Sequence, residues 1–157
     1  PDHDAAPLRE HVAAHGATAP LSELHRTLEH ARARQHAAAT VDEAGDWMAA
    51  RGAVHQALAL RGSTVALYDL RELLERLEGP PPVGAIAALR QVGDATCLDA
   101  IATAWTRIDD GWTREQLRAA GAEICERHRI TTRHAAMKRL ATKAPALAEA
   151  LQARRRG

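Results

Sequence analysis

The chain has 157 residues, of which 46% are hydrophobic and 26% are charged, and its formal net charge is +1. This composition excludes a disordered chain, and the longest segment without Asp, Glu, Lys or Arg, residues 11–22, is too short for a membrane-spanning helix. Aromatic residues make up only 3% of the chain and Phe is absent, so Leu, Ala, Ile and Val must fill the core. Such a core suits closely packed helices, and we expect an all-α fold.

Helical periodicity and capping signals divide the chain into nine predicted helices. Thr40 with Glu43 and Thr113 with Gln116 have the spacing of capping boxes, which mark helix starts. The three prolines at residues 80–82 end the helix that precedes them. The predicted helices cover residues 5–15, 18–37, 41–61, 64–78, 83–92, 95–108, 113–128, 131–142 and 144–154.

A repeated pattern follows three glycines, Gly16, Gly62 and Gly93. After each glycine, apolar residues occur at the same offsets, with the i, i+3, i+7 spacing of one helix face, and a further apolar residue extends the stripe by a turn. We expect each stripe to be buried against neighbouring helices. The three stripes are Leu21, Leu24, Leu28 and Ala31; Leu67, Leu70, Leu74 and Leu77; and Leu98, Ile101, Trp105 and Ile108.

Each of these glycines is expected to turn the chain between two helices. Glycine can adopt the left-handed conformation that satisfies the last carbonyl groups of a helix. Ser63, Asp94 or Thr18 can accept hydrogen bonds from the first N–H groups of the helix that follows. The fourth unit has no such glycine, and the Arg-His-Arg sequence at residues 127–129 occupies its turn.

The segment "LRQVGDATCLDAI" at residues 89–101 resembles a HEAT repeat, above all the short bacterial variety related to phycocyanobilin-lyase repeats. The resemblance implies a single domain, residues 1–157, folded as an α-solenoid of about four antiparallel helix pairs with a C-terminal capping helix. An ordinary helical bundle is the alternative, although a bundle would not require a glycine turn at the same place in three helix pairs. The repeat units would cover residues 5–37, 41–78, 83–108 and 113–154.

The resemblance itself says little about function, and our first hypothesis is a non-catalytic scaffold in the cytoplasm that binds a protein or peptide partner. The chain begins at Pro1 without Met and shows no basic stretch followed by an apolar one, so we interpret it as a domain excised from a larger protein. Cys97 and Cys125 lie among Ala, Leu and Ile, which favours buried thiols over a disulfide or a reactive cysteine. Reduced cysteines agree with a cytoplasmic location.

Signals for catalysis or metal binding are weak, and we predict no catalytic residue, no metal site and no cofactor. His11 and His15 have the i, i+4 spacing that can hold a metal, but solvated surface histidines are the favoured interpretation. Some HEAT-repeat proteins are iron hydroxylases with His-Glu dipeptides on successive helices, and this chain has no such dipeptide. A HEAT-like enzyme, either a metal-dependent hydroxylase or a lyase, is therefore only a third hypothesis.

The three tryptophans are expected to play different roles. Trp105 occupies a core offset of the repeat, and Trp47 is also expected in the core. Trp112 follows Asp109, Asp110 and Gly111 just before a predicted helix start, where it could pack locally against the helix or anchor a partner. HEAT-like DNA glycosylases use Trp, Asp and Arg in a cleft, but no supporting constellation surrounds these tryptophans in the sequence.

Charge is distributed unevenly along the chain. Residues 1–112 contain 10 Lys and Arg against 16 Asp and Glu, whereas residues 113–157 contain 11 against 4. The basic C-terminal third could cap the last repeat, follow a nucleic-acid backbone, or pair with an acidic protein surface such as that of a second copy. The candidate partner-binding residues are Trp112, Arg127, Arg129, Arg133, Arg154, Arg155 and Arg156.

Overall fold

The computed structural model describes residues 4–153, which form nine α-helices, one short 3-10 helix and no strand. The prediction of an all-α fold is therefore confirmed. Within this range, no helix combines the length and the apolar character that crossing a membrane requires. The elements are α1 (Ala5–His15), α2 (Leu21–Ala37), α3 (Val41–Leu60), α4 (Leu67–Glu75), α5 (Val83–Val92), η1 (Ala95–Cys97), α6 (Leu98–Arg107), α7 (Gly111–Arg127), α8 (Ala135–Lys143) and α9 (Pro145–Ala153).

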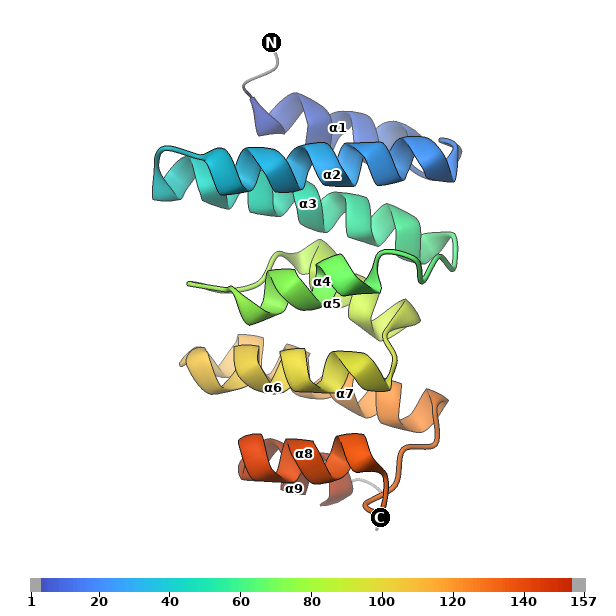
Figure 1. The fold of residues 1–157 in the computed structure, drawn as a ribbon, viewed down its shortest axis with the longest axis vertical. Helices are drawn as coiled ribbons and strands as arrows, with labels where there is room; N and C mark the ends of the chain where they lie inside the picture. Colours follow the sequence, from blue (N-terminus) through green and yellow to red (C-terminus); the bar gives the residue numbers. More distant parts are fainter. Residues whose placement is uncertain (1–3, 154–157) are drawn as a thin grey trace.

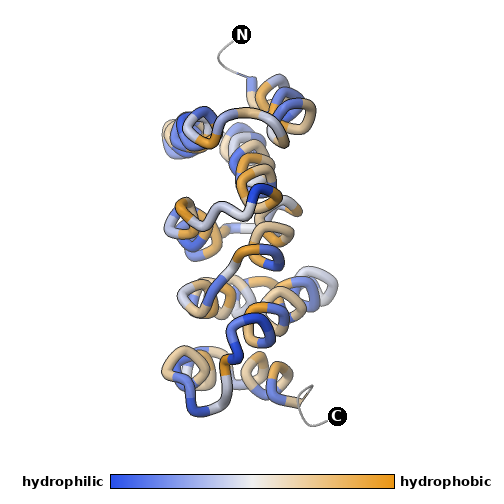
Figure 2. Tube along the Cα trace, turned by 90° about the vertical axis from the view of Figure 1, so that its right-hand side faces the viewer, coloured by the Kyte–Doolittle hydropathy of each residue, from blue (hydrophilic) through white to orange (hydrophobic). Residues whose placement is uncertain are grey.

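The helices lie in two layers that follow the chain from one end of the molecule to the other (Figure 1). In one layer α3 packs against α1 and α5, α5 packs against α7, and α7 packs against α9. In the other layer α4 packs against α6, and α6 packs against α8. Figure 2 shows the two layers from the side as neighbouring columns. The chain changes layer and reverses its direction at each loop (Figure 1). Helices of one layer therefore run in the same direction.

The apolar stripes predicted from the repeat are buried. Leu24, Leu70 and Ile101, the second residue of each stripe, are 2%, 1% and 0% exposed. Leu70 and Ile101 belong to one large cluster that extends to Leu151 in α9, so the core is continuous through most of the array. Two stripe residues are exceptions, since Leu21 is exposed at the start of α2 and Trp105 is only partly buried.

Several helices begin at other residues than the sequence predicted. α2, α4 and α8 start three or four residues later, because the residues before them form turns. α7 starts earlier, at Gly111, because Asp110 and not Thr113 caps it: the Asp110 carboxylate accepts a hydrogen bond of 2.7 Å from the Thr113 N–H. At α3 the predicted cap is confirmed, since Thr40 Oγ1 accepts from the Glu43 N–H at 3.1 Å.

The glycine turns are not all of the predicted left-handed type. Gly62 has a φ of 69°, as a left-handed turn requires, but Gly16 and Gly93 have φ of −58° and −57°. Close packing explains these two glycines. A Cβ atom at Gly16 would lie 2.8 Å from Cβ of Ala57, and one at Gly93 would lie 2.7 Å from Cδ1 of Ile124.

Two further glycines bring α3 and α5 into direct backbone contact. A Cβ atom at Gly84 of α5 would lie 2.7 Å from the carbonyl carbon of Gly52 in α3. Neither position leaves room for a side chain between the helices, because a Cβ at Gly52 would likewise lie 2.7 Å from Pro82 Cγ. This contact sets the spacing of α3 and α5 and places the start of α5 beside the middle of α3, so that α3 extends beyond α5 at its N-terminal end.

Candidate interaction groove

The first turns of α3, α5 and α7, with the loops that precede them, lie on one side of the molecule, where α3 extends about three turns beyond the start of α5 (Figure 1). Each of these turns exposes one large apolar side chain, and Val41, Val83 and Trp112 are 80%, 73% and 63% exposed. We call this region the apolar edge. It arises because the three helices belong to one layer and run in the same direction. Exposed apolar side chains grouped in this way are typical of interaction sites.

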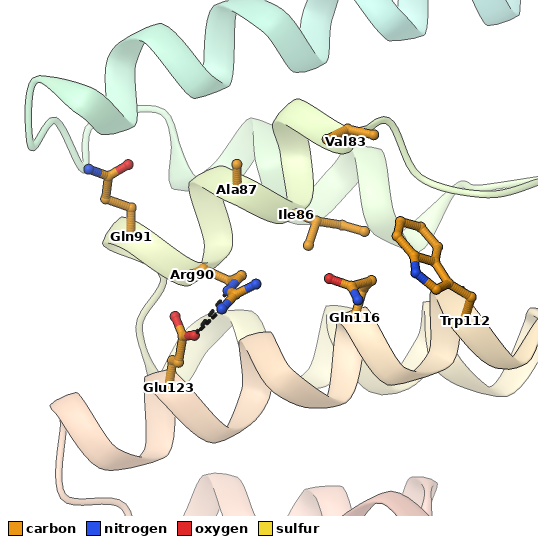
Figure 3. Close-up of a pocket in the computed structure, with 8 residues that line it drawn as sticks. All are labelled: Val83, Ile86, Ala87, Arg90, Gln91, Trp112, Gln116 and Glu123. Carbon is orange, nitrogen blue, oxygen red and sulfur yellow. Dashed lines mark hydrogen bonds and ion pairs between the residues drawn. The ribbon is translucent and has the colours of Figure 1, made fainter.

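A groove of about 490 Å³ runs between α5 and α7 from the apolar edge. Figure 3 shows Trp112 at one end of this groove, opposite Val83 and Ile86, and the Arg90–Glu123 ion pair at the other end. The Arg90 Nη2 atom lies 2.6 Å from Glu123 Oε1, and the pair links α5 to α7. The sequence predicted Trp112 either as a local packing residue or as a partner anchor, and its exposure beside the groove agrees with the second role.

The lining of the α5–α7 groove combines apolar side chains with amide groups and one ion pair. Val83, Ile86 and Trp112 supply apolar surface, while Gln91 and Gln116 supply amide groups that can both donate and accept hydrogen bonds. Shallow apolar surface with a few polar groups is the usual composition of a peptide-binding groove. None of these groups is a nucleophile paired with a base, and the one carboxylate, Glu123, is bound to Arg90.

Two more hollows lie along the apolar edge. One of about 280 Å³ is lined by residues from the loops before α5 and α7, including Ile108 and Asp110. The other, of about 690 Å³, includes Val41 and Met48 of α3. Both hollows share a wall formed by residues 78–80, so they adjoin each other. The α5–α7 groove shares no lining residue with either of them.

A buried network of charged side chains joins α3 to α4 next to the largest hollow. The Asp69 carboxylate of α4 accepts two hydrogen bonds from Arg51 of α3, with Nε 2.9 Å from Oδ2 and Nη2 2.7 Å from Oδ1. His55 Nε2, one turn further along α3, lies 2.7 Å from Asp69 Oδ2. All three side chains are buried. Arg51 also borders the hollow, where its Nη1 donates to Gln35 Oε1 of α2 at 3.1 Å.

The charges in this network compensate one another. Burial acts to raise the pKa of the Asp69 carboxyl, but hydrogen bonds from His55 and Arg51 outweigh it and lower this pKa to about 2. Arg32 of α2 binds Glu72 of α4 and lies 3.6 Å from Asp69. The network therefore fixes the relative positions of α2, α3 and α4, which form the wall of the largest hollow.

Sequence analysis did not identify this network. Arg51 and His55 are four residues apart on one helix, and Asp69 lies between Leu67 and Leu70 in the sequence but off the helix face that these leucines share. No pattern in the sequence therefore indicates that Asp69 is buried with a partner, as a buried charge requires. The identity of the partner depends on which helices are adjacent.

Several basic side chains of residues 113–153 are engaged within the protein. Arg127 donates hydrogen bonds of 2.7 Å to the carbonyl oxygens of Arg90 and Gly93, and so caps the end of α5. Arg129 occupies the turn after α7 with a φ of 52°. Arg133 is exposed, and residues 154–156, with their three predicted partner-binding arginines, lie outside the described residues. Among the described residues, Arg127, Arg129 and Arg133 do not line the α5–α7 groove beside Trp112.

Other basic side chains of this third also have partners within the protein. Arg114 packs its guanidinium 4.7 Å from the centre of the Trp105 ring, and Arg118 is hydrogen-bonded to Glu115 at 2.8 Å. Arg139 pairs with Asp99 at 3.1 Å. These contacts hold the cationic groups against the protein surface, which reduces the number available to a phosphate backbone.

The remaining candidates occupy the positions that their interpretations predicted. Trp47 is buried, and Trp105 is partly buried against the main core cluster. Cys97 and Cys125 are free buried thiols. His11 and His15 are exposed on α1, with ring centres 4.8 Å apart and ring planes tilted by 50°. No group of three potential metal ligands occurs in residues 4–153.

The chain matches no protein-family model, no curated protein and no solved structure. The geometry of the grooves is therefore the basis for the functional inference that follows.

Proposed function

We propose that this chain is a HEAT-like α-solenoid that acts as a non-catalytic docking module, and that it binds a peptide segment of a partner protein in the α5–α7 groove. Two observations support the solenoid interpretation. Successive helices alternate between two layers, and each helix pair buries its apolar stripe against its neighbours. The HEAT-like segment at residues 89–101 covers the end of α5 and the start of α6, which lies within this arrangement.

The exposure of Trp112 is the observation that carries the proposal. A tryptophan side chain presents a large apolar surface, and leaving it 63% exposed forgoes the stabilisation that burial would give. Tryptophan is also among the residues that contribute most to binding energy when a partner covers them. Its place at the mouth of a groove with Val83 and Ile86 gives a partner side chain apolar surface on two sides.

Other functions have less support from the described residues. Nucleic-acid binding through the basic third would need free cations, but Arg127 and Arg139 are engaged within the protein. An enzyme would need a reactive group in a hollow, and the α5–α7 groove offers amides and an ion pair instead. A docking module requires only the exposed apolar surface that is present.

Affinity capture with matched variants tests the proposal. The chain is immobilised and exposed to extract from the source organism, in parallel with Trp112→Ser and Val65→Ser variants. Val65 is a suitable control because it is an exposed apolar residue, at 71%, in the α3–α4 loop outside all of the hollows. We expect a protein that the wild type and Val65→Ser retain and that Trp112→Ser loses.

Two results would contradict the proposal. One is capture that Trp112→Ser leaves unchanged, which would place the interaction elsewhere on the molecule. The other is the absence of any retained protein even though the immobilised chain keeps the helical circular-dichroism spectrum of the free chain. Each variant is therefore checked for thermal unfolding before capture, so that a lost partner is not confused with a lost fold.

A further inference from the structure

We infer that the segment bound in the α5–α7 groove is an amphipathic α-helix of the partner, which lies along the groove and inserts an apolar stripe. This inference rests on the proposed docking function and specifies the conformation and the chemistry of the bound segment. Three observations carry it: the direction of the groove, the kinds of group that line it, and the balance of its charges.

The groove follows the axes of two helices that run side by side. On α5 its lining residues have the i, i+3, i+4, i+7, i+8 spacing of one helix face, from Val83 to Gln91. On α7 they run from Trp112 to Glu123. At 1.5 Å per residue, the two walls are about 12 Å and about 16 Å long. The apolar stripe of a bound helix, from position i to i+7, spans about 10.5 Å and therefore fits along the groove.

Apolar surface lies at one end of the groove and charge at the other. Trp112 and Val83 are exposed in the first turns of α7 and α5. Figure 3 shows Ile86 between these two side chains and the Arg90–Glu123 ion pair. A bound helix can thus cover the apolar end with its stripe, while polar residues beside the stripe face the ion pair and the solvent.

Other recurring modes of peptide binding need features that this groove lacks. Addition of a strand requires a sheet edge, and residues 4–153 contain no strand. Proline-rich segments bind aromatic-lined grooves, whereas Trp112 is the one aromatic side chain among the described lining residues. Acidic or phosphorylated segments bind clusters of arginines, and the arginine in this lining, Arg90, is bound to Glu123. A helix requires only an apolar groove.

The hydrogen bonds of the partner's backbone also favour a helix. The walls of the groove are helices, whose own N–H and C=O groups are bonded internally, so the lining offers a backbone mainly the amides of Gln91 and Gln116. An extended segment of the same length has about four residues, each with an N–H and a C=O group. A helix satisfies these groups internally. Covering Trp112, Val83 and Ile86 therefore costs a helix less desolvation than an extended chain.

The groove has no net charge. Arg90 and Glu123 are the charged residues of its described lining, and Arg90 donates to Glu123 Oε1 from Nε at 3.0 Å and from Nη2 at 2.6 Å. A charged segment would meet a pair that is already neutralised. We therefore expect apolar contacts to supply most of the affinity, and salt to change it little.

Selection from a random peptide library tests the inference, because the spacing of the selected side chains reports the conformation of the bound segment. Phage-displayed peptides of about 16 residues, enough for about four helical turns, are selected on the immobilised wild-type chain. We expect the enriched peptides to share apolar residues at positions i, i+3 or i+4, and i+7. A period of two would indicate a strand, and a period of three would indicate polyproline II.

Proline substitutions in an enriched peptide provide a matched second measurement. Proline in the middle of a helix breaks it, whereas proline at the first helical position is tolerated. By fluorescence anisotropy, we expect the central proline to weaken binding at least tenfold and the terminal proline to change it less than twofold. A rise in NaCl concentration should change affinity less than threefold. Trp112→Ala should weaken binding at least tenfold, but Val65→Ala, outside the hollows, should not.

The other outcomes overturn the inference and distinguish it from the docking function. Trp112-dependent peptides with a period of two or three, or with a tolerated central proline, would refute a helix and leave docking intact. A steep fall of affinity with salt would refute an uncharged contact. Enriched peptides that bind Trp112→Ala as well as wild type would refute both proposals, and so would a selection without binders. If sedimentation shows a wild-type dimer that Trp112→Ala dissolves, the occupant is a second copy.

Discussion

Gly62 and Arg129 occupy the same backbone turn at the ends of two helices of one layer. Gly62 follows α3 with a φ of 69°, and Arg129 follows α7 with a φ of 52°. In both turns the next residue bonds back into the helix: the Ser63 N–H donates to Leu58 O at 3.0 Å, and the Ile130 N–H donates to Cys125 O at 2.9 Å. The fourth unit, which has Arg129 in place of a glycine, therefore has the same backbone turn as the unit with Gly62.

Arg129→Gly is expected to stabilise the protein by about 1 kcal/mol. A left-handed conformation costs a residue other than glycine roughly 1–2 kcal/mol. Removing this cost stabilises the folded state by more than the larger conformational entropy of glycine stabilises the unfolded chain. Chemical denaturation followed by circular dichroism measures the change. Gly62→Arg should lower the free energy of unfolding by a similar amount, whereas Arg129→Ala, which keeps the strained turn, should give no gain.

Asp69→Asn should lower the free energy of unfolding by about 3 kcal/mol at pH 7, because it leaves the buried Arg51 guanidinium without its opposite charge. The effect should depend on pH. The pKa of Asp69 is lowered from 3.8 to about 2 on folding, so its stabilisation is fully present above about pH 4 and is lost as the pH falls towards 2.

Denaturant unfolding of wild type and Asp69→Asn at several pH values between 7 and 2 tests this expectation. The difference in stability between the two proteins should narrow below about pH 4. Asp46→Asn is the control, because Asp46 is an exposed residue of the same protein and should show little difference at any pH. A constant difference down to pH 2 would show that Asp69 is not held by the charges of Arg51 and His55.

Gly84→Ala should destabilise the protein by about 1–3 kcal/mol, because its Cβ would lie within 2.7 Å of the Gly52 carbonyl carbon and would push α3 and α5 apart. Gly45→Ala in α3 provides the contrast. A Cβ there meets nothing within 4 Å, and alanine is the better helix former, so this variant should be more stable by up to about 1 kcal/mol. Thermal or denaturant unfolding distinguishes the two, and equal effects would argue against a close helix contact.

Arg127→Ala should destabilise the protein by about 1–2 kcal/mol, since it removes charged hydrogen bonds to the last carbonyl groups of α5. Arg133→Ala should leave the free energy of unfolding within about 0.5 kcal/mol, because Arg133 is exposed outside any helix. The same pair of variants separates structure from binding. If partner capture falls with Arg133→Ala while stability is unchanged, the basic third contributes to recognition after all.

The sequence by itself determined the helical class, the alternation of apolar stripes and most helix positions. These properties are local, since a stripe of Leu and Ile at helical spacing must be buried on one side wherever the helix lies. Leu24, Leu70 and Ile101 were identified as core residues for this reason. Trp112 was singled out because an aromatic residue just before a predicted helix start can either pack against that helix or stand exposed as an anchor.

Only the tertiary structure decided which charged and small residues matter, because their roles depend on neighbours far apart in the chain. Asp69 is 18 residues from Arg51, and nothing local pairs them. Gly93 needs to be glycine because Ile124 of another helix occupies the space of a side chain, and not because its φ is positive. The groove likewise exists only where the parallel packing of α5 and α7 brings Val83 and Trp112 to the same edge.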